Sequence, residues 1–263
     1  MYAFDYKRPT TIDEASAALK AAPGAKLLAG GQTLIPTLKF RLANPETVID
    51  LGKVTALRGI SRQGASLVIG AMTTHAAIAE SADVKGSIPG LAMLAEGIGD
   101  PHVRNRGTIG GSVANNDPAA DYPAALLALG ATVTTSKRTI AADAFFTGLF
   151  STALAEDEIM TSISFPVPQS FAYAKFANPA SRYALVGVAV ARTATGPRVA
   201  VTGAGSSGVF RWTAAEQALA ANFNAGAIGS LKPDASGLMS DLHAAADYRA
   251  HLVNVMARRA VGA

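Results

Sequence analysis

The residues best suited to chemistry lie in two glycine-rich stretches about eighty residues apart, Leu28–Pro36 and Arg104–Pro123. In the second stretch, Gly110 and Gly111 lack a Cβ atom, so the backbone there can adopt positive φ and can approach a ligand closely. Three polar residues, Asn115 and its two successors, come next. The pattern predicts a glycine turn followed by an irregular polar loop. Alone, a Gly-Gly pair is more often an ordinary turn between two elements.

A helix is predicted directly after this loop. Asp117 would be its N-cap and Pro118 would occupy its first turn. Free N–H groups and the positive end of the dipole at a helix start favour an anionic group such as phosphate. The stretch therefore indicates a loop that holds a ligand.

The first stretch has the same design. Gly30 and Gly31 follow a short predicted strand and can present N–H groups, and Gln32 and Thr33 add side-chain hydrogen bonds. No third glycine completes a dinucleotide-binding fingerprint, and no Gly-Lys-Ser/Thr completes a P-loop. Two such loops, each leading into a helix, indicate one extended ligand with a central diphosphate held from two sides.

The composition excludes several classes of protein. Of the 263 residues, 49% are hydrophobic and 16% charged, and no apolar run reaches the ~20 residues that cross a bilayer, so a cytoplasmic protein without a membrane span is expected. Cysteine is absent, which excludes thiolate nucleophiles and cysteine-ligated zinc or iron–sulfur clusters. The net charge of +4 is not concentrated in a basic block, so no nucleic-acid partner is expected. The sequence predicts neither a metal site nor a catalytic residue in this chain.

The four histidines are scattered. His243 and His251 are predicted to be surface residues. His75 is predicted to be satisfied locally at a helix start, with a role beside a flavin as the less favoured alternative. The acidic run Glu156–Glu158 is interpreted as a solvated turn before a strand rather than as part of a pocket.

Hydrophobic periodicity predicts alternating helices and strands up to Pro166 and Pro168. Thr11 and Glu14 predict a capping box at the first helix. The predicted helices are 11–22, 34–41, 75–80 (capped by Thr74), 88–98, 119–129 (ended by Gly130) and 142–150, and the predicted strands are 26–29 (buried), 47–51, 66–70, 131–135 and 158–165.

The two prolines mark a predicted domain boundary, with residues 1–167 forming one domain of two α/β subdomains and residues 168–263 a second, α+β domain. Past the boundary the pattern alternates with period 2, which predicts an antiparallel meander with a hairpin at Thr195–Pro197. The predicted strands are 171–177, 186–194 and 198–204, and the predicted helices 213–221 and 244–260.

At this point the sequence resembles a known family. Leu28–Pro36, Gly70–His75, Arg104–Pro123 and the tail segment 237–251 together look like the FAD-binding medium subunit of molybdenum hydroxylases, the xanthine dehydrogenase and aerobic carbon monoxide dehydrogenase family. The resemblance covers the whole chain. It implies an α+β fold: a two-subdomain FAD-binding domain of the vanillyl-alcohol-oxidase/PCMH type, followed by a C-terminal antiparallel sheet with helices.

The resemblance also implies roles for individual residues. The first stretch would wrap the FAD diphosphate, and the second would form the other wall of the flavin site. Asp121 would bond a sugar or ribityl hydroxyl, Lys175 would be a basic group near the flavin, and Tyr183 would lie near its ring; two further positions, 98 and 160, would be apolar contacts. The implied cofactor-binding residues are Leu28, Ala29, Gly30, Gly31, Gln32, Thr33, Leu34, Ile98, Thr108, Ile109, Gly110, Gly111, Asn115, Asp121, Met160, Lys175 and Tyr183.

Simpler interpretations stay open for three of these residues. Asp121 could be a helix N-terminal acid favoured by the dipole, Lys175 a solvent-facing strand residue, and Tyr183 an ordinary core residue. The FAD is expected to be non-covalent, because cysteine is absent and neither glycine loop contains a histidine.

The implied function is electron transfer within an oxidoreductase. Substrate would be hydroxylated at a molybdenum cofactor on a large partner subunit. Electrons would then pass through [2Fe-2S] clusters on a small partner subunit to the FAD held here, in a dimer of such heterotrimers. A free-standing FAD-dependent oxidoreductase of the same fold, and a non-redox nucleotide-binding module, are the alternatives.

Overall fold

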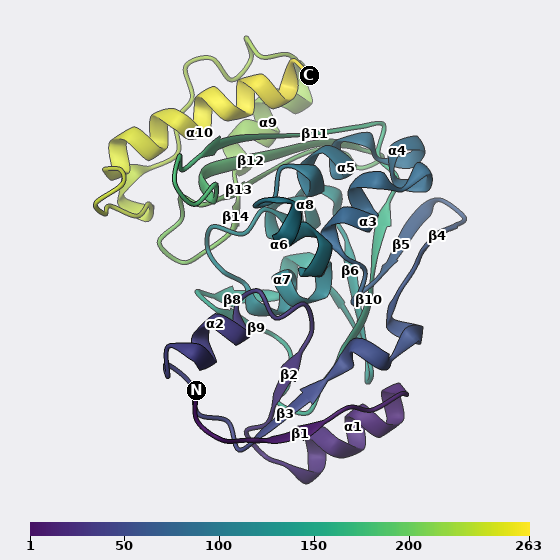
Figure 1. Ribbon diagram of the computed structural model, residues 1–263. Helices are drawn as coiled ribbons and strands as arrows, with labels where there is room; N and C mark the ends of the chain where they lie inside the picture. The colour runs from purple at the N-terminus through teal and green to yellow at the C-terminus, as the bar shows by residue number, and fades with distance from the viewer.

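The computed structural model describes all residues 1–263 and arranges them in three units stacked along the molecule (Figure 1). The first unit, at the bottom of Figure 1, is a parallel three-stranded sheet in the order β1–β3–β2. Helix α1 packs Ala15 and Leu19 against Ile49 of the sheet. The elements of this unit are β1 (Asp5–Lys7), α1 (Ile12–Ala21), β2 (Lys26–Leu28), α2 (Leu34–Lys39) and β3 (Thr47–Asp50).

Helix α1 begins where the sequence predicts. The Thr11 hydroxyl accepts a hydrogen bond from the Glu14 N–H at 3.1 Å. The reciprocal half of the predicted capping box is different, because the Glu14 carboxylate accepts from the N–H and hydroxyl of Thr10. The prediction of a buried strand at 26–29 is wrong: β2 pairs only with β3, so it is an edge strand whose residues are exposed or half-buried.

The second unit is an antiparallel five-stranded sheet in the order β4–β5–β10–β6–β7, with helices packed on it. Two 3₁₀ turns, Leu51–Lys53 and Thr55–Leu57, connect it to the first unit. Its elements are β4 (Ile60–Gln63), β5 (Ser66–Gly70), α3 (His75–Glu80), α4 (Ala82–Ser87), α5 (Pro89–Glu96), α6 (Pro101–Arg106), α7 (Ile109–Asn115), α8 (Tyr122–Leu129), β6 (Thr132–Thr135), β7 (Thr139–Ala141) and β10 (Met160–Pro166).

Helix α7 replaces the irregular loop that the sequence predicts. Thr108 caps it, because its hydroxyl accepts from the Gly111 N–H at 3.1 Å, and Asn116 ends it at φ 44°. Neither Gly110 nor Gly111 has positive φ. Gly110 is required for a different reason: a Cβ atom there would lie 2.6 Å from the Cβ and the carbonyl oxygen of Ala71.

Helix α8 also begins later than predicted. Asp117 accepts from the Ala119 N–H within a turn instead of capping a helix, and α8 starts at Tyr122 with Pro123 in its first turn. Every residue of α8 is buried, since it packs between β10 on one side and the C-terminal sheet on the other. A helix enclosed in this way is apolar all round. Its predicted end at Gly130, in the left-handed region with φ 62°, is confirmed.

The predicted helix at 142–150 is wrong. A 3₁₀ turn at Ala142–Ala144 leads into a small hairpin of β8 (Phe146–Gly148) and β9 (Ser151–Thr152). The Asn116 side-chain amide donates to the carbonyl oxygens of Gly148 and Ser151, both at 2.8 Å. This tertiary contact favours the hairpin over local helix propensity.

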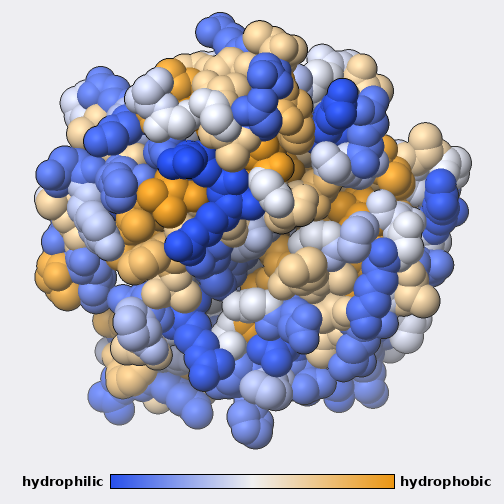
Figure 2. Space-filling model, turned by 90° about the horizontal axis from the view of Figure 1, so that it is seen from above, coloured by the Kyte–Doolittle hydropathy of each residue, from blue (hydrophilic) through white to orange (hydrophobic).

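The third unit, at the top of Figure 1, is the predicted antiparallel meander, with α9 and α10 packed on it. Figure 2 shows this end of the molecule from above, where hydrophobic residues form separate patches among hydrophilic ones. None of the helices in the structure combines the length and the apolar character needed to cross a bilayer. The elements are β11 (Ser170–Ala177), β12 (Ala184–Thr193), β13 (Gly196–Thr202), β14 (Phe210–Arg211), α9 (Thr213–Ala221), a 3₁₀ turn at Ala235–Gly237, and α10 (Ala246–Val261).

The second and third units share one apolar core. Phe171, Ala189, Ala191 and Ala200 of the C-terminal sheet belong to the same buried cluster as α8 and the five-stranded sheet. The domain boundary at 167/168 stays a prediction. On the outer face, the buried Arg249 of α10 donates to both carboxylate oxygens of Asp241, at 2.9 and 2.8 Å, and to two carbonyl groups, which fixes the tail.

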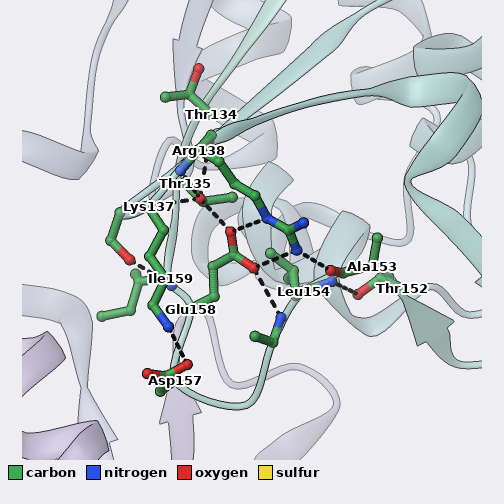
Figure 3. A network of polar contacts seen from close by, with 12 residues as sticks. Thr134, Thr135, Lys137, Arg138, Thr152, Ala153, Leu154, Asp157, Glu158 and Ile159 are labelled. Carbon is green, nitrogen blue, oxygen red and sulfur yellow. Dashed lines mark hydrogen bonds and ion pairs between the residues drawn. The ribbon is translucent and has the colours of Figure 1, made fainter.

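The turn before β10 is organised by a buried carboxylate (Figure 3), so the interpretation of Glu156–Glu158 as a solvated turn is wrong for Glu158. Glu158 accepts from the Arg138 guanidinium at 3.0 Å through each oxygen, from the Thr135 hydroxyl at 2.6 Å and from the Ala155 N–H at 2.9 Å. These donors, the Arg138 guanidinium first, lower the pKa of Glu158 from its ordinary 4.5 to about 2.

Replacing Glu158 with glutamine therefore reduces stability. We expect the free energy of unfolding at pH 7 to fall by about 1–3 kcal/mol, because charge-assisted hydrogen bonds to a buried group are lost. The folded-state pKa is lowered, so this contribution is complete above pH 4.5 and disappears as the pH falls toward 2. Urea unfolding at several pH values measures it. Glu156→Gln, in the exposed part of the same turn, is the control; equal effects of the two substitutions would contradict the network's role.

Candidate functional site

The two glycine stretches meet in space. Gly30 lies against the backbone at the end of α6: a Cβ atom on Gly30 would be 2.2 Å from the carbonyl oxygen of Arg106 and 2.7 Å from the Cα of Gly107. Such a separation is possible only for glycine. Gly31 has φ +74°, which is the left-handed region that favours glycine. The first stretch thus turns sharply against the start of the second.

The first stretch leaves its backbone donors free. None of the five consecutive N–H groups from Gly30 to Leu34 has an acceptor within the chain, and Thr33 does not cap α2 with its side chain. Successive N–H groups in a turn that leads into a helix form a concave site for anions.

The second stretch is different. At the start of α7, the N–H groups of Ile109 and Gly110 donate to the carbonyl oxygens of Thr73 and Ala71. The Gly111 N–H is occupied by the Thr108 hydroxyl. These donors hold the start of α7 onto the segment that follows β5, so they are not offered to an anion. This stretch contributes a wall rather than an anion site.

A cleft of about 830 Å³ lies between the two stretches, the start of β10 and the loop after β11. Its volume is within the range of small-molecule sites. Fourteen of the seventeen sequence-predicted residues line it: Ala29, Gly30, Gly31, Gln32, Thr33, Leu34, Ile98, Thr108, Gly110, Gly111, Asn115, Asp121, Met160 and Tyr183.

Three predicted residues do not line the cleft. Leu28 lies in β2 with its side chain beside Gly31, and Ile109 is fully buried in the core. Lys175 lies behind the cleft wall, where its ammonium group donates to the Gly97 carbonyl at 2.8 Å and to the Asp121 carboxylate at 3.2 Å. The alternative of a solvent-facing Lys175 is wrong, since its side chain is 12% exposed.

Asp121 is a buried acid at the edge of the cleft. Its side chain accepts no hydrogen bond from the first N–H groups of α8, which is the contact expected of a helix N-terminal acid. Burial raises the pKa of Asp121, and the ammonium of Lys175 and the hydroxyl of Tyr173 act in the opposite direction. The carboxyl group therefore has two donors within the chain and faces the cleft with its remaining acceptor capacity.

Tyr183 is 50% exposed and lines the cleft, so the alternative of an ordinary core residue is wrong. It follows a turn in which the Asn178 side chain accepts from the N–H groups of Ala180 and Ser181. Arg182, the preceding residue, has φ +62° and also lines the cleft. An Asn-Pro turn signal at 178–179 was available in the sequence, but its position beside α6 depends on the tertiary fold.

His75 belongs to the cleft although the sequence places it only at a helix start. Thr74 caps α3 as predicted. The imidazole is buried, its Nε2 lies beside Gly107, where a Cβ atom would be 2.6 Å away, and its Nδ1 has no hydrogen-bond partner. The prediction of local satisfaction is thus wrong for this nitrogen. Burial, and secondarily Arg104, lower the pKa of His75 to about 4, so the ring is neutral at pH 7. His243 and His251 are exposed, as predicted.

The cleft suits a ligand that is anionic at one point and aromatic at another. Five unpartnered N–H groups are matched to a diphosphate, and Ile98, Met160 and Tyr183 supply apolar and aromatic surface for a ring. The Asp121 carboxylate has acceptor capacity for a further hydroxyl group. Sequence analysis did not find several other lining residues, including Asp100, Ser181, Arg182 and Glu158, because they come from turns that approach the cleft only in the folded chain.

Comparison with known proteins agrees with this chemistry. The family profile described as "FAD binding domain in molybdopterin dehydrogenase" matches residues 2–168. The carbon monoxide dehydrogenase medium chain of Hydrogenophaga pseudoflava is 36% identical over 276 residues, covering 99% of this chain and 96% of that protein. The nicotine 6-hydroxylase medium subunit of Paenarthrobacter nicotinovorans is 35% identical over 272 residues, covering 98% and 96%.

Solved structures give the same result. The carbon monoxide dehydrogenase from Hydrogenophaga pseudoflava that lacks the Mo-pyranopterin moiety of its cofactor has a TM-score of 0.89 and 37% identity, covering 100% of this chain and 97% of that one. Quinoline 2-oxidoreductase from Pseudomonas putida 86 has a TM-score of 0.89 and 29% identity, covering 99% and 96%. The fold expected from the sequence is confirmed, and the chain belongs to the FAD-binding medium subunits of the molybdenum hydroxylase family.

Proposed function

We propose that this chain is the FAD-carrying electron-transfer subunit of a multi-subunit molybdenum hydroxylase, with FAD bound in the cleft between the two glycine stretches. The observation that carries the proposal is the run of five unpartnered N–H groups, Gly30–Leu34, on the wall of a cleft that has no other comparable donor set. A diphosphate is the part of FAD that needs such donors.

Other residues would hold the rest of the cofactor. Ile98, Met160 and Tyr183 would contact the ring system, and Asp121 would accept from a sugar or ribityl hydroxyl, with Lys175 fixed behind it. Thr108, Gly111 and Asn115 would form the opposite wall. Bound FAD supplies the redox chemistry, and the protein orients it and sets its surroundings.

The electron donor would lie on another polypeptide. This chain contains no cysteine and so cannot ligate a conventional iron–sulfur cluster. We infer a small subunit with [2Fe-2S] clusters and a large subunit with a molybdenum cofactor, assembled as a cytoplasmic dimer of heterotrimers. Relatives named as medium chains support a multi-subunit complex. The division into domains 1–167 and 168–263 belongs to the same proposal, and the family profile ends near that boundary.

Exposed apolar side chains support a protein partner. Phe40 and Leu42 are 77% and 78% exposed after α2, and Phe150 is 62% exposed in the β8–β9 turn. Arg41 and Phe150 both have positive φ, at 59° and 52°, which costs free energy in a residue with a side chain. Large exposed hydrophobic groups of this kind are characteristic of interaction surfaces.

Blocking the cleft should remove FAD without unfolding the chain. A Cβ atom at Gly111 would lie 2.9 Å from the Thr108 hydroxyl oxygen and 3.4 Å from the Ala29 Cβ, so valine would fill the space between the two stretches. We expect Gly111→Val to weaken FAD binding about tenfold or more, as for other overpacked sites, while thermal unfolding stays cooperative. Absorbance at the flavin bands of the purified protein measures occupancy.

The matched control is Gly86→Val. Gly86 is also a helical glycine, and a Cβ atom there would meet nothing within 4 Å. This substitution carries the same helix-propensity cost at a site away from the cleft. Full FAD occupancy in Gly111→Val would exclude the cleft as the flavin site.

The FAD should be held without a covalent bond, because cysteine is absent and the glycine stretches contain no histidine. Acid precipitation should leave all of the yellow colour in the supernatant. His75 lies in the cleft and is the one histidine that could form a link. Flavin that stays in the pellet of the unaltered protein but is released from His75→Gln would contradict this prediction.

Purification of the native complex through a tag on this chain should recover two further subunits, with molybdenum and iron measurable by elemental analysis. The isolated chain, reconstituted with FAD, should show no flavin bleaching on addition of small organic substrates under anaerobic conditions, because it has no substrate-oxidising centre of its own. Rapid bleaching by the isolated chain would instead identify a free-standing oxidoreductase.

A further inference from the structure

Tyr173 is a partly buried residue that none of the proposed cofactor contacts includes. It lies on β11, two residues before Lys175, and its hydroxyl donates to one carboxylate oxygen of Asp121. Lys175 donates to the other oxygen at 3.2 Å. Asp121 is 6% exposed and lines the cleft, whereas Tyr173 lies behind it. The carboxylate is thus held through both of its oxygens from a single strand.

The neighbouring strand of the sheet leaves space for the phenol ring of Tyr173. On the neighbouring strand, Ala189 lies opposite Tyr173 and Gly187 lies opposite Lys175. A Cβ atom on Gly187 would be 2.1 Å from the Tyr173 hydroxyl oxygen and 2.8 Å from its Cζ. The tyrosine therefore leans along the strand and crosses Gly187 to reach Asp121.

No backbone requirement explains this glycine. Gly187 does not have positive φ, and it lies in the interior of β12, where glycine weakens a strand. Glycine within a strand often marks the close approach of another group. Here that group is the Tyr173 hydroxyl, so the sequence of β12 is adapted to the contact between Tyr173 and Asp121.

The electrostatics agree with the geometry. Burial raises the pKa of Asp121, whereas the Lys175 ammonium and the Tyr173 hydrogen bond favour its ionised form. The other titratable groups around it are Tyr122 on α8 and Tyr183 after β11. Burial raises the pKa of Tyr122, Tyr173 and Tyr183, and the negative charge of Asp121 adds to this, so all three phenols are neutral at pH 7.

We propose that Tyr173 is a positioning residue of the cofactor site, which keeps the Asp121 carboxylate oriented as an acceptor for a hydroxyl group of FAD. This inference rests on the proposed placement of FAD in the cleft. A carboxylate has about four lone-pair positions. The two donors from β11 fix the direction of the group and leave acceptor positions for the ligand.

The test is a titration of the full chain with FAD at several pH values, in which quenching of flavin fluorescence measures binding. Tyr173→Phe should raise the dissociation constant about fivefold to tenfold, the size of one hydrogen bond to a charged group. Affinity should fall as the pH falls through the pKa of Asp121. In Tyr173→Phe this decline should begin at a higher pH, because a hydrogen bond that favours the ionised form is gone.

A double-mutant cycle separates positioning from general stability. Asp121→Asn should bind FAD more weakly and should lack the acid-side decline. Adding Tyr173→Phe to Asp121→Asn should change the dissociation constant by less than about twofold, because Tyr173 acts through Asp121. Tyr248→Phe is the matched control: it removes a phenol hydroxyl from an exposed position on α10, and FAD affinity should be unchanged.

Two results would overturn the role of Tyr173. One is an unchanged affinity and pH profile in Tyr173→Phe; the other is a loss of the same size in the Asp121→Asn background, which would indicate a purely structural effect. If one of these two results is found while Gly111→Val abolishes FAD binding, the cleft assignment stands and only the role of Tyr173 fails. If Gly111→Val binds FAD normally, both are overturned.

Discussion

The cleft depends on the contact between Gly30 and the backbone of Arg106 and Gly107. This contact joins two segments that are separated by more than seventy residues. It is possible because Gly30 has no Cβ atom, which would clash with the backbone of Arg106 and Gly107. It fixes the first glycine stretch against the end of α6 and the start of α7. The cleft then opens beside the contact, between a parallel sheet on one side and an antiparallel sheet on the other.

The two glycine stretches look alike in sequence but have different tasks. The first keeps its N–H groups free and can bind an anion. The second uses its N–H groups to hold α7 onto the segment that follows β5, and Gly110 is needed for the close approach to Ala71. The first stretch therefore offers free donors, while the second supports the wall of the cleft. A helix start that is anchored in this way provides a rigid wall, which suits a protein that must hold a flavin in a fixed position.

The two buried carboxylates that line the cleft are both paired. Glu158 is held by Arg138, and Asp121 by Lys175 and Tyr173. Unpaired charges in such positions would be strongly destabilising. His75 is buried without a charged partner, and burial lowers its pKa so that the ring is neutral at pH 7. The buried part of the cleft wall consequently carries defined acceptors and donors at neutral pH.

The sequence by itself determined the two glycine stretches, which are local signals, and its resemblance to a known family implied the fold class and fourteen of the residues that line the cleft. It also located the caps Thr11 and Thr74 and the helix end at Gly130, each decided within a few residues of chain. It failed where distant contacts decide the outcome. Asn116 stabilises a hairpin where a helix was predicted, and the donors at the start of α7 are occupied by residues from another segment. The burial of Glu158, the close approach of Tyr173 to Gly187 and the unsatisfied nitrogen of His75 likewise depend on which strands and turns become neighbours. Those are properties of tertiary packing, and no local pattern in the chain encodes them.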